Sequence, residues 1–160
     1  MPPSEGNKGY IYGGQMVSKS KLTFKYTHRK GGEKRADYAS YLVQTQDGGI
    51  PNYSLGNQTL VFQNVKRTDW GFGADLLISG GDYDGYYLSL SPQHYVQARS
   101  KALRWHFEDE GPYYTWSSPD YEVYVRITSE HVKEGSDSVY LRALAGKPTG
   151  YEGEFNIKVQ

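Results

Sequence analysis

The amino-acid sequence predicts an all-β fold in a single domain, and three observations support this. Apolar and polar residues alternate along many short segments, which is the pattern of half-buried strands. Clusters of glycine, proline and aspartate separate these segments and mark turns. No long segment has the spacing of apolar residues that an amphipathic helix requires. The 160 residues suit one domain, 1–160, with a sizeable core.

The strands can be placed in order along the chain. Residues 1–20 form an N-terminal segment of uncertain structure, in which Tyr10–Tyr12 indicates one short strand. Turns are expected at Asp47–Gly49, Gly80–Gly85 and Glu108–Pro112. A loop is expected at Trp116–Pro119. The further strands expected from the alternation are Lys21–His28, Ser40–Thr45, Thr59–Val65, Ala74–Ile78, Tyr86–Ser91, His94–Arg99, Leu103–Phe107, Tyr121–Thr128, Val139–Leu144 and Glu154–Val159.

The pair Tyr-Leu recurs in three of these strands, as Tyr41-Leu42, Tyr87-Leu88 and Tyr140-Leu141. Each pair lies between an earlier and a later alternating strand. A strand order repeated three times indicates three similar four-strand units, none of which could bury its apolar face alone. Three such units can close into a barrel without exposed edges, which is a β-trefoil. An antiparallel sandwich is the alternative, because it also contains many short strands.

The charge balance and the lack of cysteine exclude several classes of partner and site. The 18 basic and 18 acidic residues cancel, so we expect no nucleic-acid partner. No segment has the length of a transmembrane helix, and we expect no membrane insertion. The start lacks the apolar region of a signal peptide. Together with the absence of cysteine, this predicts a cytoplasmic location, with secretion left open.

Motifs for catalysis or for a cofactor are not found. The sequence contains neither a P-loop nor a nucleophile elbow. Its four histidines are far apart and do not have metal-ligand spacing. Asp82 and Asp84 lack the further ligands of a calcium loop and fit a turn better. We therefore predict no catalytic residues, no metal, no cofactor and no enzymatic activity.

The most distinctive segment runs from Tyr86 to Ala98 and reads YYLSLSPQHYVQA. It resembles the Tyr-Leu-x-x-x-Ser-Pro-Asn-His-Tyr-Trp-Ile-x-Ala segment of amaranthin-type plant agglutinins. The likeness extends loosely back to Asp75 and forward to Trp105, and elsewhere it rests on the order of strands. Those agglutinins are β-trefoil lectin domains of similar size without the Gln-x-Trp repeats of ricin-type trefoils. This chain also lacks those repeats.

The resemblance implies a glycan-binding site. In that family the Ser-Pro-Asn-His-Tyr loop contacts a galactose/N-acetylgalactosamine disaccharide, and a subunit interface completes the site. Carried over by position, the candidate residues are Ser91, Gln93, His94 and Tyr95. Gln93 stands where the family has asparagine, and Val96 replaces a tryptophan that would offer an aromatic platform. These two departures leave the sugar specificity open.

We therefore expect a non-catalytic lectin whose partners are glycans or glycoproteins and which self-associates, for example as a homodimer. Ser91, Gln93 and His94 are expected to form hydrogen bonds with sugar hydroxyls while Tyr95 packs against a sugar face. The alternative is a protein-binding β-trefoil, such as a cysteine-free protease inhibitor or the targeting module of a toxin. In such proteins the loops, and not the core, carry the function.

Overall fold

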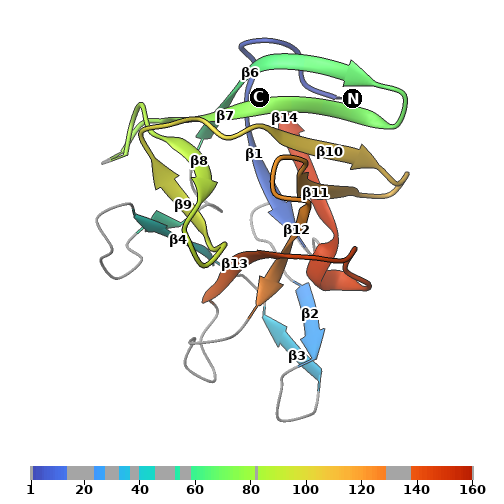
Figure 1. Cartoon of the computed structure of the whole chain (residues 1–160). Coiled ribbons are helices and arrows are strands. Elements are labelled where there is room, and N and C mark those ends of the chain that lie inside the picture. The colour runs from blue at the N-terminus through green and yellow to red at the C-terminus, as the bar shows by residue number, and fades with distance from the viewer. Residues whose placement is uncertain are drawn as a thin grey trace.

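The computed structural model describes residues 2–13, 24–27, 33–36, 40–45, 53–54, 59–81, 83–128 and 138–159. These residues are all-β, and apart from one 3₁₀ turn at Tyr151–Gly153 their regular structure is strand (Figure 1). In this part of the chain, no helix is long and apolar enough to cross a membrane. The strands are Lys8–Gly13 (β1), Phe24–Thr27 (β2), Glu33–Ala36 (β3), Ser40–Thr45 (β4), Tyr53–Ser54 (β5), Thr59–Thr68 (β6), Gly71–Ser79 (β7), Tyr87–Leu90 (β8), Val96–Arg99 (β9), Trp105–Asp109 (β10), Tyr114–Ser118 (β11), Val123–Thr128 (β12), Ser138–Leu144 (β13) and Phe155–Val159 (β14).

Six strands pair in a closed ring. Strand β1 pairs with β14 on one side and with β6 on the other. The ring continues through the antiparallel pairs β6–β7, β7–β10 and β10–β11. It closes where Tyr114 of β11 lies opposite Phe155 of β14. Closure gives each of these strands a partner on both sides, so no ring strand has an edge that is unpaired over its whole length.

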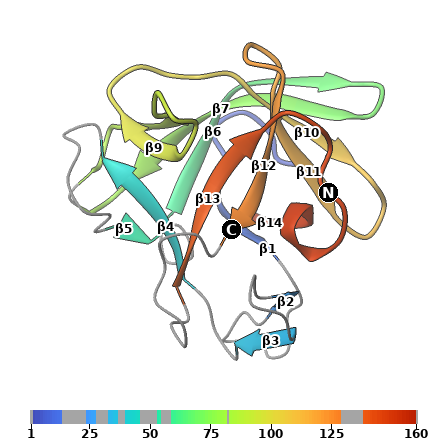
Figure 2. The same ribbon diagram turned by 60° about the horizontal axis from the view of Figure 1, so that its bottom comes forward.

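The remaining strands of the main sheet form excursions from this ring. The hairpin β8–β9 lies between β7 and β10 in the chain, and the hairpin β12–β13 lies between β11 and β14. Strand β4, between β1 and β6, pairs in parallel with both β9 and β13 (Figure 2). The three excursions therefore meet at one end of the ring. Strands β2 and β3 pair with each other in a separate two-stranded sheet.

Aromatic side chains from the ring strands form the core. Phe107 stacks on Phe72 with ring centroids 5.1 Å apart and on Trp116 at 5.8 Å. Trp116 in turn meets Phe155 edge-on at 5.3 Å. These four side chains come from β7, β10, β11 and β14, and all are fully buried. The indole N–H of Trp105 donates to the carbonyl oxygen of Leu88 at 2.9 Å, which joins the core to the β8–β9 hairpin.

Strand β11 is bonded unevenly to its neighbours. Its contact with β14 consists of the single pair Tyr114 and Phe155, whereas β1 and β14 pair over five positions. The side chains of Thr115, Trp116 and Ser118 also bury polar atoms that have no hydrogen-bond partner. A buried polar atom without a partner costs free energy, so these side chains weaken β11, which otherwise pairs with β10 over four positions.

The described strands largely confirm the predicted ones. Ser40–Thr45 has the predicted bounds, and the strand indicated at Tyr10–Tyr12 is real and extends over Lys8–Gly13. The loop predicted at Trp116–Pro119 is wrong, because Trp116 packs in the core on β11. Its neighbours Thr115 and Ser118 are buried although they are polar, which hid the alternation. The predicted turn at Asp47–Gly49 lies outside the described residues.

The three Tyr-Leu pairs do not occupy equivalent positions. Tyr87-Leu88 lies on β8, the strand that follows ring strand β7. Tyr140-Leu141 lies on β13, the strand that precedes ring strand β14. The second pair therefore lies on the first strand of its hairpin and the third pair on the second strand of its hairpin, so the dipeptide does not mark the same strand each time. A local dipeptide cannot distinguish the two strands of a hairpin, since both alternate in the same way.

The N-terminal residues hold the irregular part of β6. Gly6 N–H donates to the carbonyl oxygen of Phe62 at 2.8 Å. The register of β6 and β7 shifts between Gln63 and Lys66, which marks a β-bulge. The Glu5 carboxylate accepts a hydrogen bond from the Val65 N–H of this bulge at 2.8 Å.

Gly71 should be the most sensitive glycine of β7. A Cβ atom at this position would lie 1.8 Å from the Phe107 carbonyl oxygen, which is backbone and cannot move aside. At Gly73 the nearest atom is 3.1 Å away and belongs to the end of the Arg104 side chain. We expect Gly71→Ala to lower the free energy of unfolding by about 3 kcal/mol and Gly73→Ala to change it by less than about 1 kcal/mol. Urea unfolding of both variants checks this, and equal effects would contradict it.

Glu5 should contribute stability that depends on pH. Hydrogen bonds from the backbone N–H groups of Val65 and Asn64 hold the pKa of the Glu5 carboxyl below its usual value of 4.5. A lowered pKa means that this contribution is fully present above about pH 4.5 and is lost as the pH falls through the pKa of the folded state. We expect Glu5→Gln to be less stable than the wild type at pH 7 and equal to it in strong acid. Urea midpoints measured across this range test the prediction, and a pH-independent difference would refute it.

Candidate functional site

The candidate site is built on the tight turn that joins β8 to β9. The carbonyl oxygen of Ser91 accepts a hydrogen bond from His94 N–H at 2.8 Å, and Ser91 N–H donates to the Tyr95 carbonyl oxygen at 2.8 Å. The Ser91 hydroxyl accepts a third bond from Tyr95 N–H at 3.0 Å. His94 has a φ of 67°, in the left-handed region that few residues other than glycine adopt. The chain is thus held in one shape, with Pro92 and Gln93 exposed at its tip.

Strand β13 anchors this turn from the side. Ala143 N–H donates to the carbonyl oxygen of His94 at 2.7 Å, and Arg142 Nε donates to that of Gln93 at 3.3 Å. The Arg142 guanidinium also lies over the Tyr95 ring, 4.8 Å from its centroid, in a cation–π contact. Two elements far apart in the sequence therefore fix the positions of Gln93 and His94.

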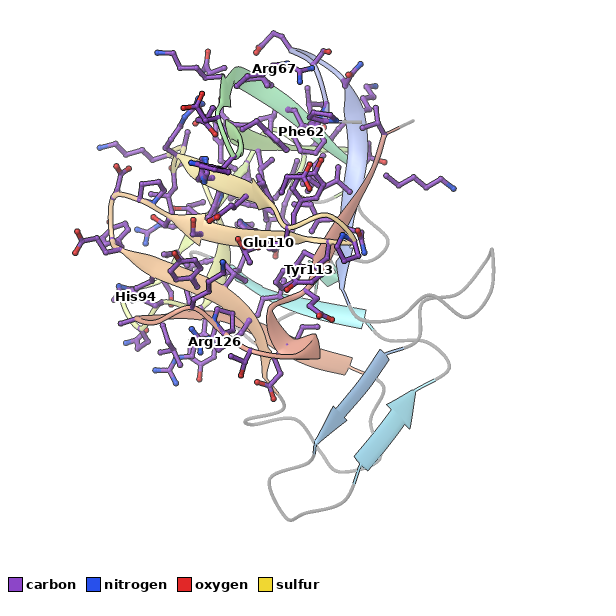
Figure 3. The ribbon with its side chains drawn as sticks, turned by 90° about the vertical axis from the view of Figure 1, so that its right-hand side faces the viewer. Phe62, Arg67, His94, Glu110, Tyr113 and Arg126 are labelled. Atoms are coloured by element: carbon purple, nitrogen blue, oxygen red, sulfur yellow. The ribbon has the colours of Figure 1, made fainter. Side chains whose placement is uncertain are left out.

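An exposed aromatic residue from a third element completes the surface. Tyr121, in the turn between β11 and β12, places its ring 5.5 Å from the His94 imidazole and remains 55% exposed. The same turn lines a shallow hollow with Ser117, Ser118, Pro119, Glu122, Val123 and Tyr124. Leu144, directly opposite Tyr124 on β13, is 39% exposed on the same face. Figure 3 shows His94 on the outside of the molecule beside these strands.

The four predicted site residues divide into two pairs. Gln93 is exposed and His94 is partly exposed, so both can meet a ligand. Ser91 and Tyr95 are 4% and 8% exposed and are engaged within the turn and against Arg142. Val96, at the position where the resembling family has tryptophan, is fully buried in the core. The turn therefore presents two of the four side chains and uses the other two to hold its shape.

Tyr121, Arg142 and Leu144 were not predicted as parts of this surface. Tyr121 was assigned to the start of a strand, but Pro119 to Glu122 form a turn, with Glu122 N–H donating to the Pro119 carbonyl oxygen at 3.3 Å. Proline followed by aspartate is a turn signal that could have exposed the error. The proximity of Tyr121 and Arg142 to His94 depends on strand pairing and has no local signal.

The side chains at this surface can form hydrogen bonds and stacking contacts. It offers an amide, an imidazole, a phenol ring and the carboxylate of Glu122 to a ligand. Behind it, Arg126 donates to the carbonyl oxygens of Leu144 at 3.1 Å and Gly146 at 2.6 Å, and burial lowers the pKa of this guanidinium. Within the described residues, no group of three or more histidine, aspartate or glutamate side chains could hold a metal ion.

Comparison of the chain with protein-family models, with curated proteins and with solved structures finds no match.

The two pairs of turn residues should respond differently to substitution. Ser91→Ala removes the acceptor of a buried N–H group, and we expect it to lower the free energy of unfolding by about 1 to 2 kcal/mol. Asparagine tolerates a positive φ, so His94→Asn should change that free energy by less than about 0.5 kcal/mol. Urea unfolding measures both values. A larger loss for His94→Asn than for Ser91→Ala would contradict the assigned roles.

Proposed function

We propose that this chain is a β-trefoil and that it binds glycans without catalysis. The trefoil is supported by the order of the strands around the ring. Each of the ring pairs β1 and β6, β7 and β10, and β11 and β14 encloses one excursion, and the three excursions meet through β4, β9 and β13. A three-unit arrangement of this kind explains why the apolar strands recur as they do.

The site we propose comprises Gln93, His94 and Tyr121. The observation that carries the proposal is the exposed Tyr121 ring against His94, on two turns that backbone hydrogen bonds hold in place. Sugars present hydroxyl groups around a ring with an apolar C–H face. An aromatic ring can cover that face, while an amide and an imidazole form hydrogen bonds with the hydroxyls.

The ligand class follows from the resemblance of Tyr86–Ala98 to the amaranthin-type agglutinins. We propose glycans that contain galactose or N-acetylgalactosamine, and glycoproteins that carry them. Ser91 and Tyr95 serve this site by shaping the turn, and Tyr121 supplies the aromatic platform that Val96 cannot. Because the turn is preorganised, little conformational entropy is lost on binding. The affinity of a single site on so open a surface should still be weak, so useful binding requires several sites.

A glycan array with matched variants tests the proposal. We expect the wild type to bind a defined set of galactose-containing glycans. The double variant Gln93→Ala/His94→Asn should lose at least about tenfold in affinity, or ~1.4 kcal/mol. Tyr121→Ala should lose a similar amount, whereas Tyr121→Phe keeps the ring and should lose less.

Two results would overturn the proposal. One is a folded wild type that binds no glycan on the array. The other is binding that the double variant and Tyr121→Ala leave unchanged. Inhibition of a protease by the wild type, with an empty array, would instead favour the protein-binding alternative.

A further inference from the structure

Large exposed hydrophobic side chains lie at two separate places in the described part of the chain. The large hydrophobic residues exposed there are Trp70, Tyr121 and Leu144. Tyr121 and Leu144 belong to the surface around His94, as described above. Trp70 lies in the turn between β6 and β7 and, at 73% exposed, it is the most exposed of the three. It has no role in the core or in the proposed glycan site.

The backbone beneath Trp70 is held firmly. Asp109 N–H donates to the Trp70 carbonyl oxygen at 2.6 Å, which joins this turn to the end of β10. The next residue, Gly71, packs so closely on the Phe107 carbonyl that no side chain fits there. The turn after β10 is also ordered, with the Asp109 carboxylate accepting a bond from Gly111 N–H at 2.8 Å. Trp70 is therefore displayed on a rigid base, as a binding platform requires.

Charged residues of both signs are exposed on the hairpin that carries Trp70 and on the neighbouring strand β10. Lys66, Arg67 and Asp69 are exposed on the same hairpin, and Asp109 is exposed beside it. The carboxylates can accept hydrogen bonds from hydroxyls, and the cations can donate them. A flat apolar ring within a mixed set of donors and acceptors complements a neutral pyranose, which has a C–H face and a rim of hydroxyls.

The same charged residues disfavour two other roles of an exposed tryptophan, which are membrane binding and a place in a protein–protein interface. A membrane-binding tryptophan works with basic residues against anionic lipid, but Asp69 and Asp109 would be repelled by that surface. A stable protein interface buries about 1,000 Å² or more around an apolar centre. Here one indole stands among charged side chains.

We propose that Trp70 is the stacking platform of a second glycan-binding site that takes neutral pyranose sugars, so that one chain carries two sites. This inference rests on the proposed function and extends it. The two sites are separate: the β6–β7 turn lies at the right of Figure 1, whereas the β8–β9 hairpin lies at the left. Figure 3 shows Arg67, near this turn, at the top of the molecule and His94 well below it. A single chain could then bridge two glycans without self-association.

Tryptophan signals offer a direct test, because the chain has three tryptophans and the other two, Trp105 and Trp116, are fully buried. The indole N–H resonance of Trp70 is assigned with Trp70→Phe. Methyl β-galactoside, N-acetylgalactosamine and methyl α-mannoside are then titrated through the millimolar range into the wild type and into Gln93→Ala/His94→Asn. Quenching of tryptophan fluorescence by acrylamide gives a second readout of Trp70 exposure.

We expect at least one sugar to shift the Trp70 resonance and to reduce quenching, with the same midpoint in both proteins. Beads coated with that sugar should be cross-linked by the wild type, while Trp70→Ala should still bind them but cross-link them at least about tenfold less well.

The second site would be overturned if none of the sugars shifts the Trp70 resonance. This holds even if the double variant loses affinity on the array and so supports the first site. Protection of Trp70 by anionic vesicles alone would also overturn the second site. A Trp70 shift together with an unchanged double variant on the array would keep the second site and reject the first.

Discussion

The stacking of aromatic side chains inside the six-strand ring is the interaction on which the rest of the structure depends. Phe107 lies between Phe72 and Trp116, and Trp116 continues the contact to Phe155. Phe107 and Trp116 face each other across the β10–β11 hairpin, whereas Phe72 on β7 and Phe155 on β14 are distant from them in the sequence. The ring therefore cannot form until these distant strands meet the hairpin. Burial of large aromatic side chains supplies much of the free energy that offsets the entropy of closing such long loops. The surface turns are held in position because they join strands that pack in this core.

In the turn at Ser91–Tyr95, some side chains stabilise the shape of the turn and others are available to contact a ligand. Ser91 and Tyr95 direct their polar and aromatic groups inward, where they satisfy the backbone and meet Arg142. Gln93 and His94 are left at the surface. A motif of this kind can therefore persist for structural reasons alone. Its use for binding depends on what neighbouring strands place beside it, which here is Tyr121.

Much of the strand content follows from local alternation, because a half-buried strand leaves that pattern in its own residues. Strand β4 and the strands around Tyr87 could be predicted on this basis. Strand β11 could not, since Thr115 and Ser118 are polar and yet buried. Half of the candidate site was likewise within reach: Gln93 and His94 sit in a recognisable turn, but Tyr121 and Arg142 come close to it only through pairing across the sheet. Such long-range pairing has no signature in any one segment.

The weak bonding of β11 has a consequence for motion and for ligand response. A strand joined to β14 at one pair of residues, and burying polar atoms without partners, should open more readily than the rest of the ring. Its amide protons would then exchange with solvent through a local fluctuation and not through global unfolding. Tyr121 lies just beyond the end of β11. A ligand that binds Tyr121 only while β11 is paired in the ring would suppress this opening. Slower amide exchange in β11 would then show that the site at the surface is occupied.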